Sequence, residues 1–155
     1  MNLNLDFIEL LNILNEAQAK YLIVGGYAVI EYTEPRYTKD LDIWVAPNRE
    51  NAEVVYQALK TFGAPLVDIT ADDFTDPDIV YHMGRPPARI DILMGLKGLK
   101  FEESWGKRLE TTYAEVRVNV IASDDLIVNK RLAGRPQDLI DVENLLMAEK
   151  IKGTK

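Results

Sequence analysis

Apolar residues recur at two different spacings along the chain, and the two spacings outline its helices and strands. Residues 5–18 and 49–62 place apolar side chains three or four positions apart, which is the period of an amphipathic helix. Short apolar runs between turn-forming residues are typical of strands. Such runs occupy residues 21–24, 41–45, 79–83, 88–93, 110–113 and 116–121. Short helices are expected at residues 26–33 and 101–106, whereas the acidic stretch at residues 68–78 predicts turns.

The last part of the chain predicts two helices separated by a break. Ser123 stands before two acidic residues, so we expect it to cap a helix over residues 124–133. Gly134 is suited to end that helix, and Pro136 is favoured at the first position of the next one. This last helix should extend to about residue 150. The pattern therefore ends in a helical pair.

Length and composition favour one α+β domain over residues 1–155. We expect a core at about residues 1–121, with a small mixed or antiparallel sheet flanked by helices, and the helical pair at about 123–150. The chain has no cysteine and one histidine, which excludes disulfides, thiolate metal sites and multi-histidine zinc sites. A net charge of -7 argues against broad nonspecific binding to nucleic acid. With no signal pattern and no membrane-spanning apolar run, we expect a cytoplasmic protein without a membrane partner.

One stretch carries most of the candidate chemistry. A strand ends in Gly25 and Gly26, and the next strand begins with Asp40 and Asp42. Residues i and i+2 of a strand point to the same face, roughly 7 Å apart along the chain. Two carboxylates held in this way repel each other unless they share a cation, and magnesium prefers oxygen ligands and carries phosphates. Because the glycine turn offers backbone N–H groups and a helix N-terminus to an anion, the stretch predicts metal-assisted chemistry on a nucleoside triphosphate.

This stretch resembles the nucleotidyltransferase superfamily, the fold of DNA polymerase beta and of small aminoglycoside-modifying enzymes. The family pattern is Gly-Gly or Gly-Ser, a spacer, Asp-x-Asp in a strand, and a third carboxylate on a later strand. Here the third acid is Asp91, within the apolar run at residues 88–93. The resemblance implies that Asp40, Asp42 and Asp91 are catalytic metal ligands for Mg²⁺, or possibly for Mn²⁺. Many family members have serine in place of Gly26.

Each of these residues also has a purely structural interpretation. Asp40 and Asp42 could be solvent-facing acids on an edge strand, and Asp91 could mark the polar face of an exposed strand. Gly25 and Gly26 could form a plain strand-to-helix turn, because glycine tolerates positive φ. The catalytic interpretation requires the strand of Asp91 to lie beside the strand of Asp42, and sequence alone cannot show this.

Two further features resemble a bacterial group that includes the abortive-infection toxin nucleotidyltransferases. One is Arg-x-Thr-x-Asp-Leu-Asp at residues 36–42, and the other is a helix with a lysine, a break and Asp-x-x-Asp within residues 123–141. The resemblance implies a set of nucleotide-binding residues, namely Gly25, Gly26, Arg36, Thr38 and Lys130. It also implies that Asp138 or Asp141 helps to position the acceptor.

Ion pairing offers an alternative role for the charged members of this set. Arg36 could pair with Glu31 or Glu34 in its own loop. Asp138 could cap the last helix, or pair with Lys130 or Arg135 between the two helices. Under that alternative the charges hold the helices together and contact no substrate.

The function implied by the resemblance is transfer of a nucleoside monophosphate from a nucleoside triphosphate to an acceptor hydroxyl, with release of pyrophosphate. The toxin-like features favour an acceptor on RNA, such as a tRNA 3′ end, or on a protein, with an antitoxin as partner. Resemblance to the drug-modifying enzymes favours an aminoglycoside or lincosamide instead, which suits an acidic protein. A non-catalytic relative that binds a nucleotide or a partner protein is a third interpretation. A homodimer or a separate helical partner could complete the site, because 155 residues leave little room for an acceptor pocket.

Overall fold

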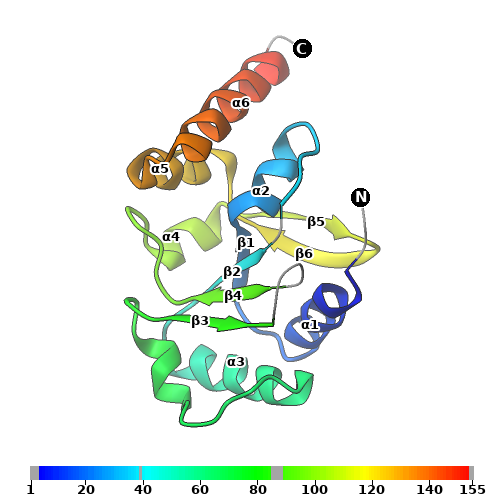
Figure 1. Cartoon of the computed structure of the whole chain (residues 1–155), viewed down its shortest axis with the longest axis vertical. Helices are drawn as coiled ribbons and strands as arrows, with labels where there is room; N and C mark the ends of the chain where they lie inside the picture. Colours follow the sequence, from blue (N-terminus) through cyan, green and yellow to red (C-terminus); the bar gives the residue numbers. More distant parts are fainter. Residues whose placement is uncertain (1–3, 39, 85–88, 154–155) are drawn as a thin grey trace.

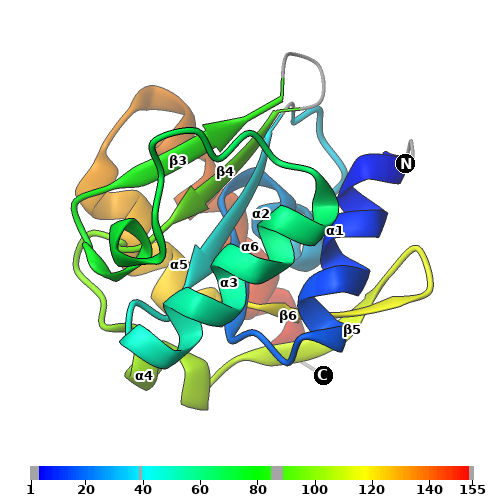
Figure 2. The same ribbon diagram turned by 90° about the horizontal axis from the view of Figure 1, so that it is seen from below.

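The described residues form a six-stranded mixed sheet with helices on both faces (Figures 1 and 2). The computed structural model describes residues 4–38, 40–84 and 89–153. The strands are β1 Tyr21–Val24, β2 Leu41–Val45, β3 Val80–Met83, β4 Ile90–Leu93, β5 Leu109–Tyr113 and β6 Val116–Val120. The helices are α1 Leu5–Glu16, α2 Gly25–Tyr32, α3 Arg49–Phe62, α4 Phe101–Gly106, α5 Ser123–Ala133 and α6 Pro136–Gly153, with a 3₁₀ turn, η1, at Ala71–Thr75. The expected α+β fold with a C-terminal helical pair is confirmed.

The strand order explains how residues far apart in sequence meet. The sheet runs β3-β4-β2-β1-β6-β5. β2 is antiparallel to β1 and parallel to β4, whereas β1 is parallel to β6. The two edges are the antiparallel hairpins β3–β4 and β5–β6. Because β2 and β4 are neighbours, the strand of Asp91 lies beside the strand of Asp42, as the catalytic interpretation requires.

The helices divide into two layers, one on each face of the sheet. α1 and α3 cover one face of the sheet, and α2, α5 and α6 lie on the other side (Figure 2). The core is built from the apolar residues of the central strands, and Trp44 is 1% exposed and packs edge-on against Phe101 at 5.1 Å between ring centroids. Burying side chains of this size contributes about 1.5–3 kcal/mol each. No helix in the described part of the chain has the length and apolar content needed to cross a membrane.

Three details differ from the expectations. Ser123 does not cap α5: the extended residue before the helix is Ala122, and the Ser123 hydroxyl is buried without a partner among the described residues. The helix therefore begins one residue earlier than its sequence pattern suggested. α6 continues to Gly153, beyond the expected end at residue 150. The expected start of the fourth strand at residue 88, and its link to the preceding strand, fall in residues 85–88, outside the described residues.

Candidate active site

The three predicted acids gather at one end of β2 and β4. The register of these parallel strands places Asp42 directly opposite Asp91. Asp40 lies immediately before β2, two residues from Asp42. Asp91 is 7% exposed, and its carboxyl group lies close enough to that of Asp42 to raise the pKa of Asp42. The structure therefore brings the predicted acids together from two segments about fifty residues apart in sequence.

Burial and mutual repulsion set the protonation of this pair. Burial raises the pKa of Asp42 to about 7, and the charge of Asp91, a hydrogen bond from protonated Asp42 to Asp91 and the charge of Asp40 act in the same direction. For Asp91, burial would raise the pKa, but hydrogen bonds from Arg89 and His82 lower it below its usual value. Asp42 thus holds the proton of the pair, which relieves a concentration of negative charge.

Arg89 and His82 are functional candidates that the sequence analysis missed. The Arg89 guanidinium donates two hydrogen bonds to Asp91, from Nε to Oδ1 and from Nη2 to Oδ2, both at 3.0 Å. Its Nη2 atom also lies 3.6 Å from Asp40 Oδ2. His82 faces Asp91 across the β3–β4 hairpin, with Nδ1 2.6 Å from Oδ1. The Arg-x-Asp alternation within one strand could have revealed Arg89, whereas His82 depends on a cross-strand register.

The carboxylate oxygens of this site suit a hard divalent cation, although Arg89 occupies the space between two of the acids. Within the described residues, no three acidic or histidine side chains form a group that could hold a metal ion. Arg89 instead bridges Asp40 and Asp91 and supplies positive charge between them. The buried Asp42–Asp91 pair nevertheless offers oxygen donors only, and its excess negative charge is now balanced by a proton and a guanidinium. A divalent cation could replace both.

The predicted glycine turn lies directly over the acids. Gly25 has φ of 66°, in the left-handed region that favours glycine, and a Cβ atom there would collide with the carboxylate of Asp42. A Cβ atom at Gly26 would collide with the side chain of Thr38. Both glycines open α2, whose first backbone N–H groups have no acceptor within the helix. The turn thus places backbone N–H groups that have no acceptor within the helix against the acid cluster.

The charged residues of the helical pair form a buried network. Lys130 Nζ lies 3.2 Å from Asp138 Oδ1 and 3.0 Å from Asp141 Oδ2. Arg135 Nε contacts Asp138 Oδ2 at 2.7 Å, and the Arg135 backbone N–H donates to the same oxygen at 3.2 Å. Both acids are essentially inaccessible to solvent, and Lys130 is 6% exposed. In this conformation Asp138 therefore pairs with Lys130 and Arg135, as the ion-pairing alternative predicted.

Arg36 joins this network and does not form the local pairs considered from the sequence. Its Nη2 atom lies 3.0 Å from Asp141 Oδ2, a partner 105 positions away, and not beside Glu31 or Glu34. Its Nε atom is buried and has no hydrogen-bond partner among the described residues. Arg36 therefore keeps an unused donor near the glycine turn.

A pocket of about 430 Å³ collects most of the predicted nucleotide-binding residues. From the predictions it includes Gly25, Gly26, Arg36, Thr38, Asp42, Lys130 and Asp138. It also includes Asn129, Arg135 and Gln137, which the sequence analysis did not select for nucleotide binding. The Arg135 side chain is 76% exposed while its Asp138 partner is buried, so a positive charge stands at the pocket mouth.

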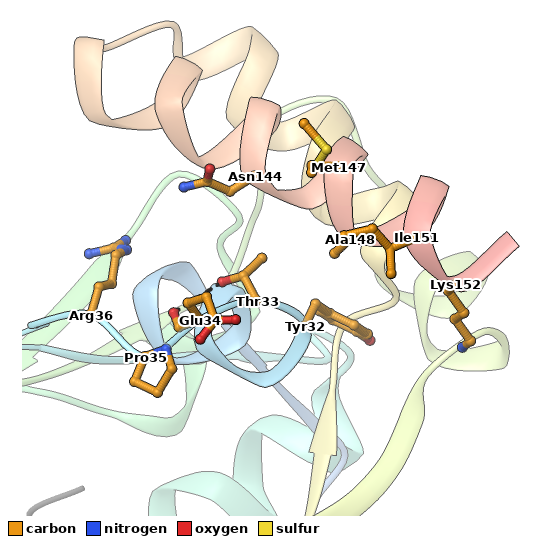
Figure 3. Close-up of a pocket in the computed structure, with 10 residues that line it drawn as sticks. All are labelled: Tyr32, Thr33, Glu34, Pro35, Arg36, Asn144, Met147, Ala148, Ile151 and Lys152. Atoms are coloured by element: carbon orange, nitrogen blue, oxygen red, sulfur yellow. Dashed lines mark hydrogen bonds between the residues drawn. The ribbon is translucent and has the colours of Figure 1, made fainter. Parts of the chain in front are cut away.

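A second groove, of about 610 Å³, lies between the loop after α2 and the outer half of α6 (Figure 3). Tyr32, Thr33 and Pro35 form one side, and Met147, Ala148 and Ile151 face them from α6. Its polar members are Glu34, Arg36, Asn144 and Lys152. Because Arg36 lines both cavities, the groove adjoins the pocket that contains the glycine turn.

Comparison with known families identifies the fold and the class of enzyme. A family model described as "Nucleotidyltransferase of unknown function (DUF6036)" matches residues 4–153. The chain belongs to this nucleotidyltransferase family. No protein with a curated description matches the chain in sequence. The superfamily assignment made from the glycine turn and the three acids is confirmed.

Solved nucleotidyltransferase structures share the fold at low sequence identity. The lincomycin-bound lincosamide antibiotic adenylyltransferase LnuA has a TM-score of 0.59 and 16% identity, over 92% of this chain and 96% of that one. The antibiotic-resistance factor ANT(2'')-Ia has a TM-score of 0.63 and 14% identity, over 97% of this chain and 84% of that one. A nucleotidyltransferase-like protein from Paracoccidioides brasiliensis has a TM-score of 0.56 and 15% identity, over 95% of this chain and 76% of that one.

Proposed function

We propose that the protein transfers a nucleoside monophosphate from a nucleoside triphosphate to an acceptor hydroxyl, in a reaction that needs Mg²⁺ or Mn²⁺. The observation that carries the proposal is the register of Asp42 opposite Asp91, directly under the Gly25 turn and at the edge of a 430 Å³ pocket. Family membership supports the transferase activity, and nucleotidyltransferases generally use divalent metals.

Several groups in the pocket could bind the phosphates of the nucleoside triphosphate. Gly25 and Gly26, the first residues of α2, line the pocket, and their backbone N–H groups would bind phosphate oxygens. The free Nε donor of Arg36 and the exposed guanidinium of Arg135 would donate hydrogen bonds to further phosphate oxygens. Lys130 would act mainly through Asp138, because its ammonium is already paired with buried carboxylates.

Asp40, Asp42 and Asp91 would hold the divalent cation. When bound, this cation supplies positive charge to the phosphates and acidifies the acceptor hydroxyl. Arg89 and His82 fix both oxygens of Asp91, which would orient it toward that hydroxyl. The acceptor oxygen forms a bond to the α-phosphorus as the bond to the bridging oxygen breaks. The hydroxyl proton passes to Asp91 and pyrophosphate leaves.

A small molecule is the acceptor that the second groove favours. Its volume of about 610 Å³ lies within the ~300–1,000 Å³ range of small-molecule sites. The groove has apolar walls from Tyr32 and Met147, and its polar members offer one carboxylate, at Glu34, beside two cations, at Arg36 and Lys152. Glu34 would bind an amine of the acceptor, and the two cations would face its hydroxyl or anionic groups. Two similar solved structures are described with lincomycin and with adenylyl-2''-tobramycin. An RNA or protein hydroxyl, with an antitoxin partner, is the second candidate, supported by the Arg-x-Thr-x-Asp-Leu-Asp stretch at residues 36–42.

The donor half of the proposal can be tested without knowing the acceptor. ATP, GTP, CTP and UTP are titrated into the protein by calorimetry, with and without Mg²⁺, beside Asp42→Asn. Asp78→Asn is a matched control, because Asp78 is exposed and lies outside the pocket. We expect Mg²⁺-dependent binding of at least one nucleotide, retained in the control and lost in Asp42→Asn. If the wild type binds no nucleotide, the non-catalytic interpretation replaces this one.

The acceptor is then identified by transfer of label from the α-phosphate of the preferred nucleotide. Aminoglycosides, lincosamides, bulk tRNA and total protein are the four acceptor classes, each assayed with and without pyrophosphatase. A Glu34→Gln variant should raise KM for an aminoglycoside and leave KM for the nucleotide unchanged. Label found in tRNA or protein, and in neither antibiotic class, would favour the second candidate.

A further inference from the structure

The last helix exposes an apolar stripe that the rest of the chain does not cover. On α6, Leu139 is 50% exposed, Ile140 51%, Leu146 40% and Met147 59%. Residues spaced by one, six, seven or eight positions fall on one side of a helix with 3.6 residues per turn. The opposite side of the same helix is occupied by a buried set, namely Asp138, Asp141, Val142 and Leu145. α6 therefore carries apolar residues on two sides, although only one of these sides packs within the chain.

The position of α6 leaves this stripe accessible. The helix extends outward at one end of the molecule, away from the sheet (Figure 1). Within the described residues, α5 and α2 are the elements against which it packs most closely. Four apolar side chains on one exposed helical face are more than the single scattered hydrophobics of an ordinary surface. The face thus has the composition of an interface core.

Two charges stand within the stripe at a spacing that makes it self-complementary. Glu143 and Lys150 are both exposed, lie seven positions apart and so share the apolar side. Neither side chain has a hydrogen bond or ion pair within the described part of the chain. If two copies of the helix meet antiparallel, a two-fold axis between Leu146 and Met147 places each Glu143 opposite the Lys150 of the other copy. That axis also places Leu146 opposite Met147 of the other copy.

We propose that this stripe binds a second copy of the chain, as an antiparallel α6–α6 contact around a two-fold axis. A two-fold interface is isologous, so a patch that carries both charges satisfies itself twice. An axis through Glu143 would pair Leu139 with Met147 and Ile140 with Leu146, but it brings two glutamates together and leaves both Lys150 side chains without an acid. The axis between Leu146 and Met147 pairs all four charges and sets Leu139 and Ile140 at the end of the partner's α6. The Leu146–Met147 layer forms the centre of the contact, and the two Glu143–Lys150 pairs flank it. This inference does not rest on the proposed activity.

The contact has a consequence for the groove of Figure 3. Met147 belongs both to the stripe and to the groove wall. The second copy would therefore border the groove and make it deeper than it is in one chain. A dimer would thus change the shape of this groove, whatever the groove binds, in addition to holding two chains together.

Charge reversal tests the proposal in a way that simple loss of folding cannot imitate. We would measure the dimer dissociation constant by sedimentation equilibrium for the wild type, Glu143→Lys, Lys150→Glu and the double variant. Each single reversal turns two attractive pairs into two repulsive ones and should weaken the dimer at least about tenfold. The double variant restores both pairs with their signs exchanged, so it should return to within about threefold of the wild type.

The chain offers a control pair with the same charges and spacing. Glu53 and Lys60 are exposed on α3, also seven positions apart, at the other end of the molecule (Figure 1). Glu53→Lys and Lys60→Glu change the net charge equally and should leave the dissociation constant unchanged. A wild type that stays monomeric up to about 0.5 mM overturns the proposal, since even a weak specific dimer associates there. A double variant as weak as the single variants overturns it equally.

Discussion

Asp141 links the two C-terminal helices to the loop after α2. Its side chain is fully buried, and it accepts hydrogen bonds at 3.0 Å from Lys130, Arg36 and Gln137. Asp141→Ala would remove all three contacts at once. The Lys130 ammonium, whose side chain is 8% exposed, would then keep only Asp138 as its partner, at 3.2 Å. The variant therefore leaves a buried cation half-compensated.

The expected loss of stability follows from that arrangement. Removing one partner of a buried ion pair costs about 3–5 kcal/mol, because the remaining charge stays desolvated. Asp138 still compensates Lys130, and Arg36, whose side chain is 27% exposed, can turn to water. We therefore expect the lower end, about 3 kcal/mol. For a chain of this length, that lowers Tm by about 6–12 °C.

Urea and thermal unfolding, followed by circular dichroism, measure this loss. The control is Asp124→Ala, which breaks a 2.8 Å contact with Lys107 on a side chain that is 66% exposed and should cost less than about 1 kcal/mol. A cost for Asp141→Ala no larger than the control would refute the structural interpretation of the network. Lys130→Met then separates the two roles of the lysine. A structural lysine lowers the unfolding free energy when removed, whereas a triphosphate ligand lowers nucleotide affinity with little change in stability.

Three other predictions concern the glycine turn and the acid that caps α6. Gly25→Ala should abolish nucleotide binding in calorimetry through its collision with the first acid of β2, whereas Gly63→Ala, at φ of 93° with nothing within 4 Å, should only lose stability. Gly26→Ser should collide with Thr38 and cost about 1–3 kcal/mol, and a Thr38→Ala background should recover most of it in urea unfolding. Burial would raise the pKa of Asp138, but hydrogen bonds from its cationic partners lower it below 3.8. Ionised Asp138 therefore contributes its full stabilisation at pH values above 3.8, and this stabilisation is lost as the pH falls through the lower pKa of the folded state. Unfolding free energies measured as a function of pH should differ between the wild type and Asp138→Asn near neutral pH and become equal in acid.

Local sequence was enough to predict the strands and the glycine turn. β2 begins and ends where the apolar run at residues 41–45 does, because a polar loop precedes it and Pro47 follows soon after. Gly25 was predicted as a turn residue, and its positive φ and its contact with the acid of β2 explain why glycine stands there. The start of α5 was wrong by one residue, because backbone conformation at Ala122 decides it and not the hydroxyl of Ser123.

Partners that are distant in sequence could not be predicted, because only the sheet register and the helix packing bring them together. Arg36 has two acids within five residues along the chain, Glu31 and Glu34, yet its partner is Asp141 of α6. His82 reaches Asp91 because the β3–β4 hairpin places the two opposite each other. A sequence pattern shows only the charges that are near each other along the chain. In the folded protein, the ion pairs form between residues that packing brings together in buried positions.

The charge balance around the pocket gives a physical reason for metal dependence. Five acids face the site region, namely Asp40, Asp42, Asp91, Asp138 and Asp141. Four bases form ion pairs with these acids, namely Arg36, Arg89, Lys130 and Arg135. Every base is already paired with an acid, so the chain has no net positive charge to offer a triphosphate, which carries several negative charges. Nucleotide binding should therefore disappear in excess EDTA and return with Mg²⁺; strong nucleotide binding in EDTA would show that the pairs open to release Arg36 or Lys130 instead.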